Sequence, residues 1–534
     1  MQDVPLSIPM ILDRATVLGT TMKIVSVEPA GVDRRTWPDI TNRALRLAAA
    51  LDNLGVPKGA AVGSFAWNGH RHLELYYGVP CSGRVLHTIN VRLHPDDISY
   101  VVDHAADEVI FVDASLTPVL APLRERLDVR TFVVMEDGAE IHPTFDSEPR
   151  YEELINGEDP IEPLAVDEKD AASICFTSGT TGRPKAVVYS HRSVVLHSMG
   201  ELMVDGHAIR RADVVLPLTP MFHVNCWGLP YAGGLAPASL IFAGADTSPN
   251  ATASLIQSER PTVLAGIPTF WVQMDKVFSS DEYDLSSVER ILCGGAEAAP
   301  ALIERYTSRG IDFFHGWGMT EMSPSGTGSW AAGGSQNVEH GSKQGVPAPT
   351  VQMRIVSDDG SVLPWDGEAV GEVQVRGPWI AAAYLNPNDD SNQARFIDGW
   401  LRTGDVGRVA PDGTLEIVDR TKDLIKSGGE WISSVELERN LVAHPAVAEA
   451  AVVAVPHERW GERPVALVVL RDDASVTAEE IEKFLATRVA SWQVPDRIEF
   501  AADLPKTGVG KIDKRRLRDE LVPRFAGGGQ HVEQ

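Results

Sequence analysis

Short runs of β-branched and aromatic residues alternate with helical patterns between residues 40 and 309. Helical patterns lie at Ile40–Leu54 and Pro300–Arg309. The strand candidates are short and apolar, and they are Ala61–Phe65, Val109–Asp113, Phe132–Met135, Ser173–Thr177, Val214–Leu218, Leu240–Ala243, Val263–Ile267 and Ile291–Cys293. Because strands and helices alternate, the pattern predicts an α/β fold of stacked layers with largely parallel sheets.

The pattern changes after about Val351. Three β-rich segments follow, Val351–Val356, Gly371–Arg376 and Asp405–Asp419, and the final hundred or so residues resemble a small α+β unit. A chain of 534 residues is too long for one core, so several domains are expected. Two segments are predicted to be loops: acidic Gly138–Lys169 and Gly/Ser-rich Ser325–Gln344.

Charge excludes several classes of partner. The formal net charge is −26, which gives no electrostatic footprint for nucleic acid or an anionic membrane. Any anionic ligand therefore needs a local basic cluster. The four cysteines show no CxxC spacing and are expected to be buried thiols of a reducing compartment. With no signal-peptide pattern in Met1–Thr20, a cytoplasmic location is predicted.

One stretch, Val214–Ala245, contains no charged residue. Four prolines and four glycines interrupt it, so no continuous membrane-spanning helix is expected. A charge-free stretch of this kind is better explained as core together with the lining of an apolar pocket.

The first chemical motif is Thr177-Ser-Gly-Thr-Thr-Gly-Arg-Pro-Lys185, directly after a predicted strand. Gly179 and Gly182 allow the backbone to turn tightly, while hydroxyl and N–H groups face one concavity beside Arg183 and Lys185. These groups are suited to cradle a polyphosphate, although the GxxxxGK[ST] spacing of a Walker A loop is absent. Alone, such a loop is also compatible with a plain turn.

The second motif is His315-Gly-Trp-Gly-Met-Thr-Glu321. The aromatic ring of Trp317 can stack under an adenine, Thr320 can bind a phosphate, and Glu321 can hold Mg²⁺ by one carboxylate. The motif is weak when it stands alone.

Two later motifs carry charge. Asp405, in Thr403-Gly-Asp405, suits the two hydroxyls of a ribose, and the spacing of Lys422 and Lys426 predicts two ammonium groups on one helical face. In Pro505-Lys-Thr-Gly-Val-Gly-Lys511 glycines flank a late lysine. A solvated surface is the alternative for each of these lysines.

In this order the four motifs resemble those of the adenylate-forming superfamily, which comprises acyl-CoA synthetases, peptide-synthetase adenylation domains and firefly-type luciferases. The resemblance extends from about Thr36 to Leu517. Three further segments are most similar to bacterial medium- and long-chain fatty acid–CoA ligases: Val187-Val-Tyr-Ser-His-Arg192, Pro220-Met-Phe-His-Val-Asn225 and Lys426-Ser-Gly-Gly-Glu-Trp-Ile-Ser-Ser434. The resemblance implies an AMP- and acyl-binding domain over residues 1–419, with stacked α/β layers and a β-rich subdomain, and a small mobile α+β domain over 420–534.

The resemblance also implies catalytic roles. Lys511 would bridge the carboxylate and the α-phosphate, Glu321 and Thr177 would hold Mg²⁺, Lys426 would contact the adenylate in the second step, and His223 would lie beside the acyl carboxylate. The implied nucleotide and coenzyme contacts are Thr177, Ser178, Gly179, Thr180, Thr181, Gly182, Lys185, Gly295, His315, Gly316, Trp317, Thr320, Asp405, Arg420, Lys422 and Trp431.

For the acyl group, the resemblance implies that Val224 and Trp227 face a tunnel that a tryptophan gates. Two positions depart from the superfamily's pattern: Trp317 stands where many relatives have tyrosine, and Trp431 follows Glu430 where Gly-Glu-Asn is common. Either ring can stack on adenine, and the second departure favours the fatty-acid branch.

The implied reaction is ATP- and Mg²⁺-dependent ligation of a carboxylic acid to coenzyme A through an acyl-adenylate. The resemblance implies a medium- or long-chain fatty acid, and the charge-free Val214–Ala245 fits its apolar acyl group. An α-amino acid is not expected, because this stretch offers no carboxylate to pair with its ammonium group. Alternatives are a short thioether or branched acid such as 3-methylmercaptopropionate, an adenylase that loads a carrier protein, and a luciferase-like oxygenase or non-catalytic nucleotide-binding protein. A homodimer is a candidate assembly.

Overall fold

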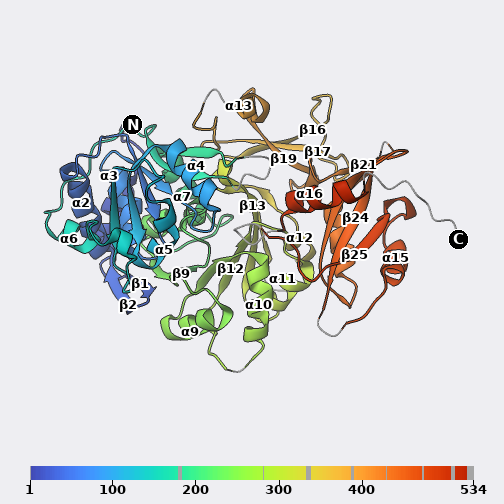
Figure 1. Ribbon diagram of the computed structural model, residues 1–534, viewed down its shortest axis with the longest axis horizontal. Coiled ribbons are helices and arrows are strands. Elements are labelled where there is room, and N and C mark those ends of the chain that lie inside the picture. Colours follow the sequence, from blue (N-terminus) through green and yellow to red (C-terminus); the bar gives the residue numbers. More distant parts are fainter. Residues whose placement is uncertain are drawn as a thin grey trace.

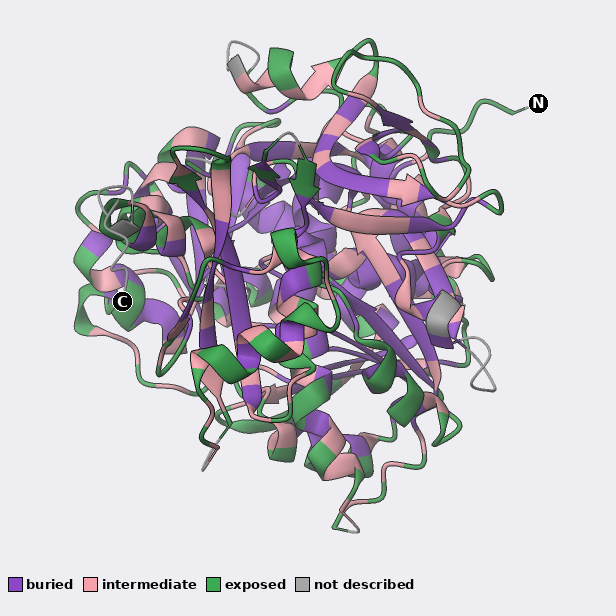
Figure 2. Ribbon diagram, turned by 90° about the vertical axis from the view of Figure 1, so that its right-hand side faces the viewer, coloured by how far each residue is buried: buried purple, intermediate pink, exposed green. Residues whose placement is uncertain are grey.

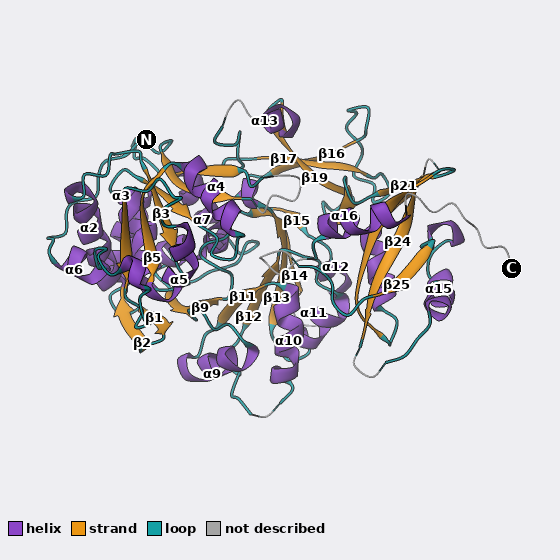
Figure 3. Ribbon diagram, in the orientation of Figure 1, coloured by secondary structure: helices purple, strands orange, loops and turns teal. Residues whose placement is uncertain are grey.

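The structure is a computed structural model that describes residues 2–177, 183–280, 282–331, 338–386, 390–428, 430–471, 474–506 and 512–525. Its strands form four sheets (Figure 1). Figure 3 shows helices covering the two large sheets of the N-terminal half, with the C-terminal sheet and its helices to one side. The predicted α/β layers, β-rich subdomain and small α+β unit are confirmed.

The two large sheets are mostly parallel. The six-stranded sheet has the order β6 (Thr131–Met135), β5 (Asp107–Asp113), β3 (Ala61–Phe65), β4 (Val85–Thr88), β7 (Ala171–Phe176), β8 (Ala186–Ser190). The nine-stranded sheet has the order β15 (Val346–Pro347), β14 (Ser325–Ala331), β13 (Asp312–Gly318), β12 (Arg290–Gly294), β11 (Val263–Gly266), β9 (Val214–Pro217), β10 (Ser239–Phe242), β1 (Lys23–Glu28), β2 (Gly31–Thr36). Only strands at or near the sheet edges pair antiparallel: β7 with β8, β1 with β2, and β13 with β14 with β15.

The other two sheets have five strands each. One is wholly antiparallel and contains β16 (Gln352–Val356), β17 (Gly371–Arg376), β19 (Trp400–Val409), β18 (Phe396–Ile397) and β20 (Leu415–Arg420). The C-terminal sheet contains β22 (Glu430–Ile432), β21 (Ile425–Ser427), β24 (Gly461–Leu470), β23 (Val447–His457) and β25 (Arg497–Phe500).

Helices cover the sheets and leave the central strands buried (Figure 2). In the N-terminal half they are α1 (Ile8–Leu18), α2 (Trp37–Asn53), α3 (His70–Cys81), α4 (Pro95–Ala105), α5 (Thr117–Leu120), α6 (Tyr151–Asn156), α7 (His191–Leu202) and α8 (Leu229–Leu235). The later ones are α9 (Pro249–Glu259), α10 (Pro268–Phe278), α11 (Pro300–Thr307), α12 (Val338–Ser342), α13 (Asp390–Arg395), α14 (Ser434–Val442), α15 (Ala478–Ala486) and α16 (Lys514–Phe525). Among the described residues, none of these helices has the length and apolar character needed to traverse a bilayer.

Two loop predictions were wrong in part, because each segment also contains regular structure. The segment Gly138–Lys169 contains α6, whose Tyr151 and Ile155 are fully buried. The segment Ser325–Gln344 contains β14 and α12, and its small residues are required by close packing. A Cβ atom at Gly328 would lie 2.1 Å from the ring of Phe314, so this position of the strand cannot carry a side chain that would mark it as a strand in the sequence.

The charge-free stretch is core, as predicted. Every residue from 221 to 243 is buried except His223 and Trp227, which are partly exposed. The four cysteines are free and buried, also as predicted.

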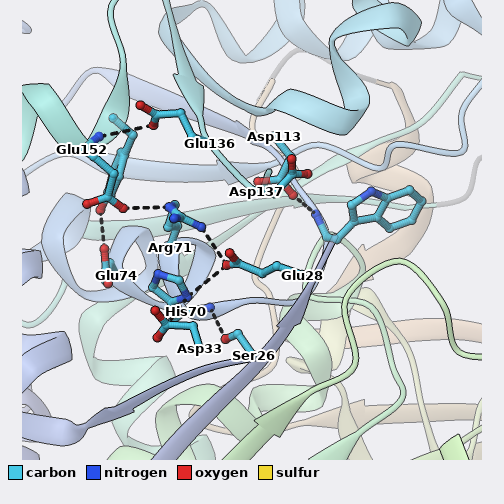
Figure 4. A network of polar contacts seen from close by, with 12 residues as sticks. Ser26, Glu28, Asp33, His70, Arg71, Glu74, Asp113, Glu136, Asp137 and Glu152 are labelled. Atoms are coloured by element: carbon cyan, nitrogen blue, oxygen red, sulfur yellow. Dashed lines mark hydrogen bonds and ion pairs between the residues drawn. The ribbon is translucent and has the colours of Figure 1, made fainter. Parts of the chain in front are cut away.

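A network of ion pairs joins α2, α3, α6 and β1. Figure 4 shows the part of it that lies on α3, α6 and β1. Glu74 of α3 is fully buried and lies 2.7 Å from Arg43 Nε, and it accepts a hydrogen bond of 2.7 Å from Tyr151 Oη. Arg71 bridges Glu28 at 2.7 Å and Glu152 at 2.9 Å. Since each buried charge in this group has a partner, the network is stable only while its members remain intact.

We therefore expect Glu74→Gln to lower the free energy of unfolding by roughly 3–5 kcal/mol, because it leaves the half-buried guanidinium of Arg43 with one carboxylate fewer. Urea denaturation at neutral pH measures the effect. As a control, Glu479→Gln removes an exposed ion pair with Lys483 and should leave the free energy of unfolding nearly unchanged, because solvent screens such a pair. Equal losses in the two variants would contradict a structural role for the network.

Candidate active site

The two ends of the Gly/Thr-rich loop are held together at its base. The N–H of Thr177 donates to the carbonyl of Lys185 at 2.9 Å, and the N–H of Lys185 donates to Thr177 Oγ1 at 3.1 Å. Thr177 follows β7 and Lys185 precedes β8, so the antiparallel pair fixes where the loop begins and ends. The predicted contacts Ser178, Gly179, Thr180, Thr181 and Gly182 lie outside the described residues.

The second motif lies beside this base. Tyr189 Oη, from β8, donates to the carbonyl of Thr320 at 2.6 Å. The carboxylate of Glu321 is buried and accepts a hydrogen bond of 2.6 Å from Tyr384 Oη, and the N–H of Leu385 donates to the carbonyl of Ala186 at 2.9 Å. Residues from the six-stranded sheet, the nine-stranded sheet and the segment after β17 therefore meet around Glu321.

The ribose candidate Asp405 belongs to the same assembly. The indole N–H of Trp317 donates to Asp405 Oδ2 at 2.8 Å, and Arg420 Nε lies 3.4 Å from Asp405 Oδ1. Asp405 is nearly buried, whereas the side chain of Arg420 is 44% exposed and so free to turn toward a ligand. The structure thus brings Trp317, Asp405 and Arg420 together, as the sequence predicted.

His315 and Gly295 shape the neighbouring wall. The ring of His315 is buried, and Nε2 lies 3.3 Å from the carbonyl of Ala296. Burial lowers the pKa of His315, so the ring is neutral at pH 7 and donates through Nε2 to that carbonyl. Gly295 has a φ of 84°, which glycine adopts without strain. A Cβ atom at Gly316 would lie 2.9 Å from the ring of Phe314.

The acyl candidates lie on an unusual turn. Residues Val224–Gly228 have φ values of 46°, 45°, 54°, 56° and 75°, so five consecutive residues are in the left-handed region. Each non-glycine residue there costs about 1–2 kcal/mol relative to a right-handed conformation. Such strain persists only where surrounding contacts enforce it, and it is frequent at functional sites.

This turn carries two of the predicted acyl contacts. Val224 is buried, and its N–H donates to Cys175 Sγ at 3.1 Å, whereas the ring of Trp227 lies against Gly294 at the end of β12. A Cβ atom at Gly294 would lie 3.2 Å from the carbonyl oxygen of Gly316 and 3.5 Å from the Trp227 ring. Trp227 therefore lies beside the strand that carries the second motif. His223, directly before the turn, is partly exposed.

The C-terminal candidates do not lie on a helix, which corrects one prediction. Residues 421–424 form a turn, and Lys426 is in β21, opposite Trp431 of β22. The Lys426 ammonium lies 4.5 Å from the centroid of the Trp431 ring. Along a strand, side chains alternate between the two faces of the sheet. The four-residue spacing from Lys422 to Lys426 therefore does not place both ammonium groups on one helical face. Lys511, the predicted catalytic lysine, lies outside the described residues.

Three tryptophans of the C-terminal sheet are 41–42% exposed: Trp431, Trp460 and Trp492. They surround the β21–β22 hairpin, because the N–H of Gly428 donates to the carbonyl of Trp460 at 2.8 Å and Arg463 joins Ser427 Oγ to the carbonyl of Trp492. Arg459 lies over the ring of Trp460 at 4.5 Å. Exposed aromatic faces beside cations are suited to bind a base that carries phosphates.

Sequence reasoning missed Tyr384, which donates a hydrogen bond to Glu321, and left Tyr189 without a role. Tyr189 lies within a quoted motif, Val187–Arg192, so that motif was an available signal. Tyr384 follows three alanines without any charge or glycine pattern, and only the tertiary contact reveals it.

Comparison with known proteins agrees with this geometry. The family profile "AMP-binding enzyme" matches residues 16–385, and "AMP-binding enzyme C-terminal domain" matches residues 436–511. The chain is 41% identical to a 3-methylmercaptopropionyl-CoA ligase of Ruegeria lacuscaerulensis over 99% of both chains. It is also 41% identical to a long-chain-fatty-acid–CoA ligase of Thermus thermophilus, over 99% of this chain and 98% of the relative.

Among solved structures, an anthranilate CoA ligase in complex with anthranoyl-AMP matches with a TM-score of 0.86. The sequence identity is 25%, and the match covers 98% of this chain and 100% of that chain. All three of these proteins join an organic acid to coenzyme A.

The partly buried ammonium of Lys422, in the segment after β20, should make the stability of the protein depend on pH. Burial, together with the nearby charges of Arg420 and Arg518, lowers the pKa of Lys422 to about 8 from its ordinary 10.5. The unfolded chain therefore binds more protons than the folded one between these values, and this side chain makes stability rise with pH through that window. Relative to Lys422→Met, the wild type should gain thermal stability as pH rises from about 8 to 10.5. A constant difference in melting temperature over that range would contradict the burial of this ammonium.

Proposed function

Since this chain belongs to the AMP-binding enzyme family, we propose that it joins a carboxylic acid to coenzyme A through an acyl-adenylate, releasing AMP and pyrophosphate. AMP-forming acid–CoA ligation is the chemistry that its relatives share. One observation carries the proposal: the base of the Thr177–Lys185 loop, Glu321 and the Trp317–Asp405 pair meet at one place.

ATP fits this place by the chemistry of its groups. The phosphates would lie along the Gly/Thr-rich loop, the adenine against Trp317, and the ribose at Asp405 with Arg420 beside it. Among the described residues no group of three or more His, Cys, Asp or Glu side chains could hold a metal ion. Glu321 and Thr177 offer two oxygen ligands, which fits Mg²⁺ because that ion binds nucleotide phosphates with few protein ligands. When bound, Mg²⁺ would neutralise phosphate charge.

The acid must then attack the α-phosphate, which brings two anions together. We assign Lys511, at the end of the last glycine-rich motif, to offset that repulsion. The boundary we propose runs between residues 419 and 420, with the C-terminal unit turning about Lys422 between two half-reactions. In the described arrangement Lys426 and Trp431 contact each other on the C-terminal hairpin. We assign their contact with the adenylate to the arrangement of the second half-reaction.

Coenzyme A is the acceptor that we favour over a carrier protein. Its adenine and phosphates match the three exposed tryptophans and the adjacent cations Lys426, Arg459 and Arg463. A thiol carried on a protein would present no base for these rings to stack on. The acceptor surface thus supports a ligase more than an adenylase that loads a carrier.

The acid that we propose is a medium- or long-chain fatty acid. Its support is the charge-free segment from 221 to 243, which is buried except for the partly exposed His223 and Trp227. A short thioether acid is the second candidate, because the Ruegeria and Thermus relatives are equally similar at 41%. Each buried methylene contributes ~0.8 kcal/mol, about fourfold in binding, so small changes beside Trp227 could move the optimum between these acids.

An AMP-release assay with ATP, Mg²⁺ and coenzyme A tests the function across straight-chain acids, aromatic acids and short thioether acids. We expect the largest kcat/KM for a fatty acid of medium or greater length. If none of the acids in the series leads to release of AMP, the proposal is overturned. A maximum of kcat/KM at a short thioether acid would select the second candidate.

In the same assay Lys511→Ala should abolish acyl-AMP formation, with a loss of ~10²–10³ or more in rate, while thioester formation from supplied acyl-AMP is largely retained. Lys506→Ala is a matched control, because this lysine in the same motif pairs with Glu449 at the surface. Equal losses in both half-reactions would discredit the role of Lys511.

For the acceptor, we expect Trp492→Ala to raise KM for coenzyme A roughly tenfold and to leave KM for ATP unchanged, because stacking on a base contributes about 1–3 kcal/mol. Trp365→Ala is the control, since that indole is 39% exposed but lies in the segment before β17. A KM for coenzyme A that responds equally to both changes would refute the stacking surface.

A further inference from the structure

Asn225 has no role in the proposed chemistry, yet it is the second residue of the left-handed turn. Its side chain is buried, at 3% exposure, and both ends of the amide have partners. Nδ2 donates to Ser173 Oγ at 2.8 Å, and Oδ1 accepts from Thr88 Oγ1 at 3.3 Å. Ser173 is in β7 and Thr88 in β4, two neighbouring parallel strands of the six-stranded sheet.

The turn is also supported on its opposite side. Gly228 lies against the ring of His197, since a Cβ atom there would come within 2.5 Å of it. This ring is fixed by Glu201 and Ser325, whose atoms lie 3.2 Å and 3.1 Å from His197 Nε2. Burial lowers the pKa of His197 to about 3, so the ring is neutral and its orientation rests on these two contacts.

The turn therefore spans the two large sheets. Asn225 is fastened to strands β4 and β7 of one sheet, while Trp227, two residues later, rests on Gly294 of β12 in the other. Asparagine is the residue other than glycine that most readily adopts left-handed backbone, so it combines the required conformation with a side-chain anchor. Loss of the anchor would let the turn relax toward right-handed conformations and move the indole.

We propose that Asn225 is a positioning residue that holds Trp227 in place from the six-stranded sheet and thereby determines the length of acyl group that the enzyme accepts. This inference rests on the proposed acid–CoA ligation. Asn225 acts through Trp227 and does not contact the reacting atoms. Its contribution should consequently appear in discrimination between acids and not in the handling of ATP.

The test compares kcat/KM across a ladder of straight-chain acids for the wild type, Asn225→Ala and Asn225→Gly. Glycine keeps the left-handed preference without the anchor, and alanine loses both. With Asn225→Ala we expect the ratio between the best acid and the acid two carbons longer to change by about tenfold, because each methylene is worth about fourfold in binding. The glycine variant should shift in the same direction by a smaller factor. KM for ATP should stay within about twofold of the wild type in both.

Ser173→Ala removes the hydroxyl group of β7 that accepts the hydrogen bond from Asn225 Nδ2. It provides a second test if Asn225→Ala does not fold. It should shift the length profile in the same direction, and the double variant should shift it no further than Asn225→Ala alone. Asn250→Ala, at an exposed site in α9, is the matched control and should leave the profile unchanged.

An active enzyme whose length profile is the same in all Asn225 and Ser173 variants would overturn this inference alone. A wild type that forms no acyl-CoA from any acid would instead overturn the proposed function. A parallel loss of kcat/KM for every acid, with the profile unchanged, would assign Asn225 a purely structural role and likewise refute the inference.

Discussion

The hydrogen bond from Tyr189 Oη to the carbonyl of Thr320 ties the two large sheets together at the candidate active site. Tyr189 belongs to β8 of the six-stranded sheet, and Thr320 directly follows β13 of the nine-stranded sheet. Tyr384 adds a third connection by donating to Glu321. Because both tyrosines are buried, their hydroxyl groups need these partners, and the sheets cannot separate without leaving them unpaired. The positions of the candidate nucleotide-binding residues depend on this constraint.

The same two sheets also fix the acyl side. The strained turn at Val224–Gly228 is stable only because β4, β7, α7 and β12 contact it from different directions. Nucleotide and acyl candidates therefore share one scaffold, so a change in the spacing of the sheets would affect both. This coupling suits a reaction in which the acid and the α-phosphate must be held in contact while water is excluded.

Local signals in the sequence predicted the residues that meet at the nucleotide end. Thr177 and Lys185 carry glycine and hydroxyl patterns, Glu321 follows a Gly-flanked ring, and Asp405 follows Thr403-Gly, so each could be found without a structure. Strand β14 could not, because its glycines resemble a loop, whereas in the structure Gly328 is packed against the ring of Phe314 and Gly326 against that of Trp317. The spacing of Lys422 and Lys426 predicted a helix, but pairing of β21 with β22 and β24 overrides that local periodicity.

The sequence by itself determined the layered α/β architecture, the charge-free core segment and the order of the motifs, since these follow from hydrophobic periodicity and residue chemistry along the chain. Only the tertiary structure decided which side chains hold these motifs in place. Tyr384, Asn225, His197 and Glu201 are ordinary polar residues in the sequence, and their roles follow from distant partners. Tyr384 bonds to Glu321, 63 positions away, and Asn225 to Ser173, 52 positions away. His197 and Glu201 both contact Ser325, which lies 128 and 124 positions away. Burial forces each of these groups to find a hydrogen-bond partner, and folding, not local sequence, determines which partner is within reach.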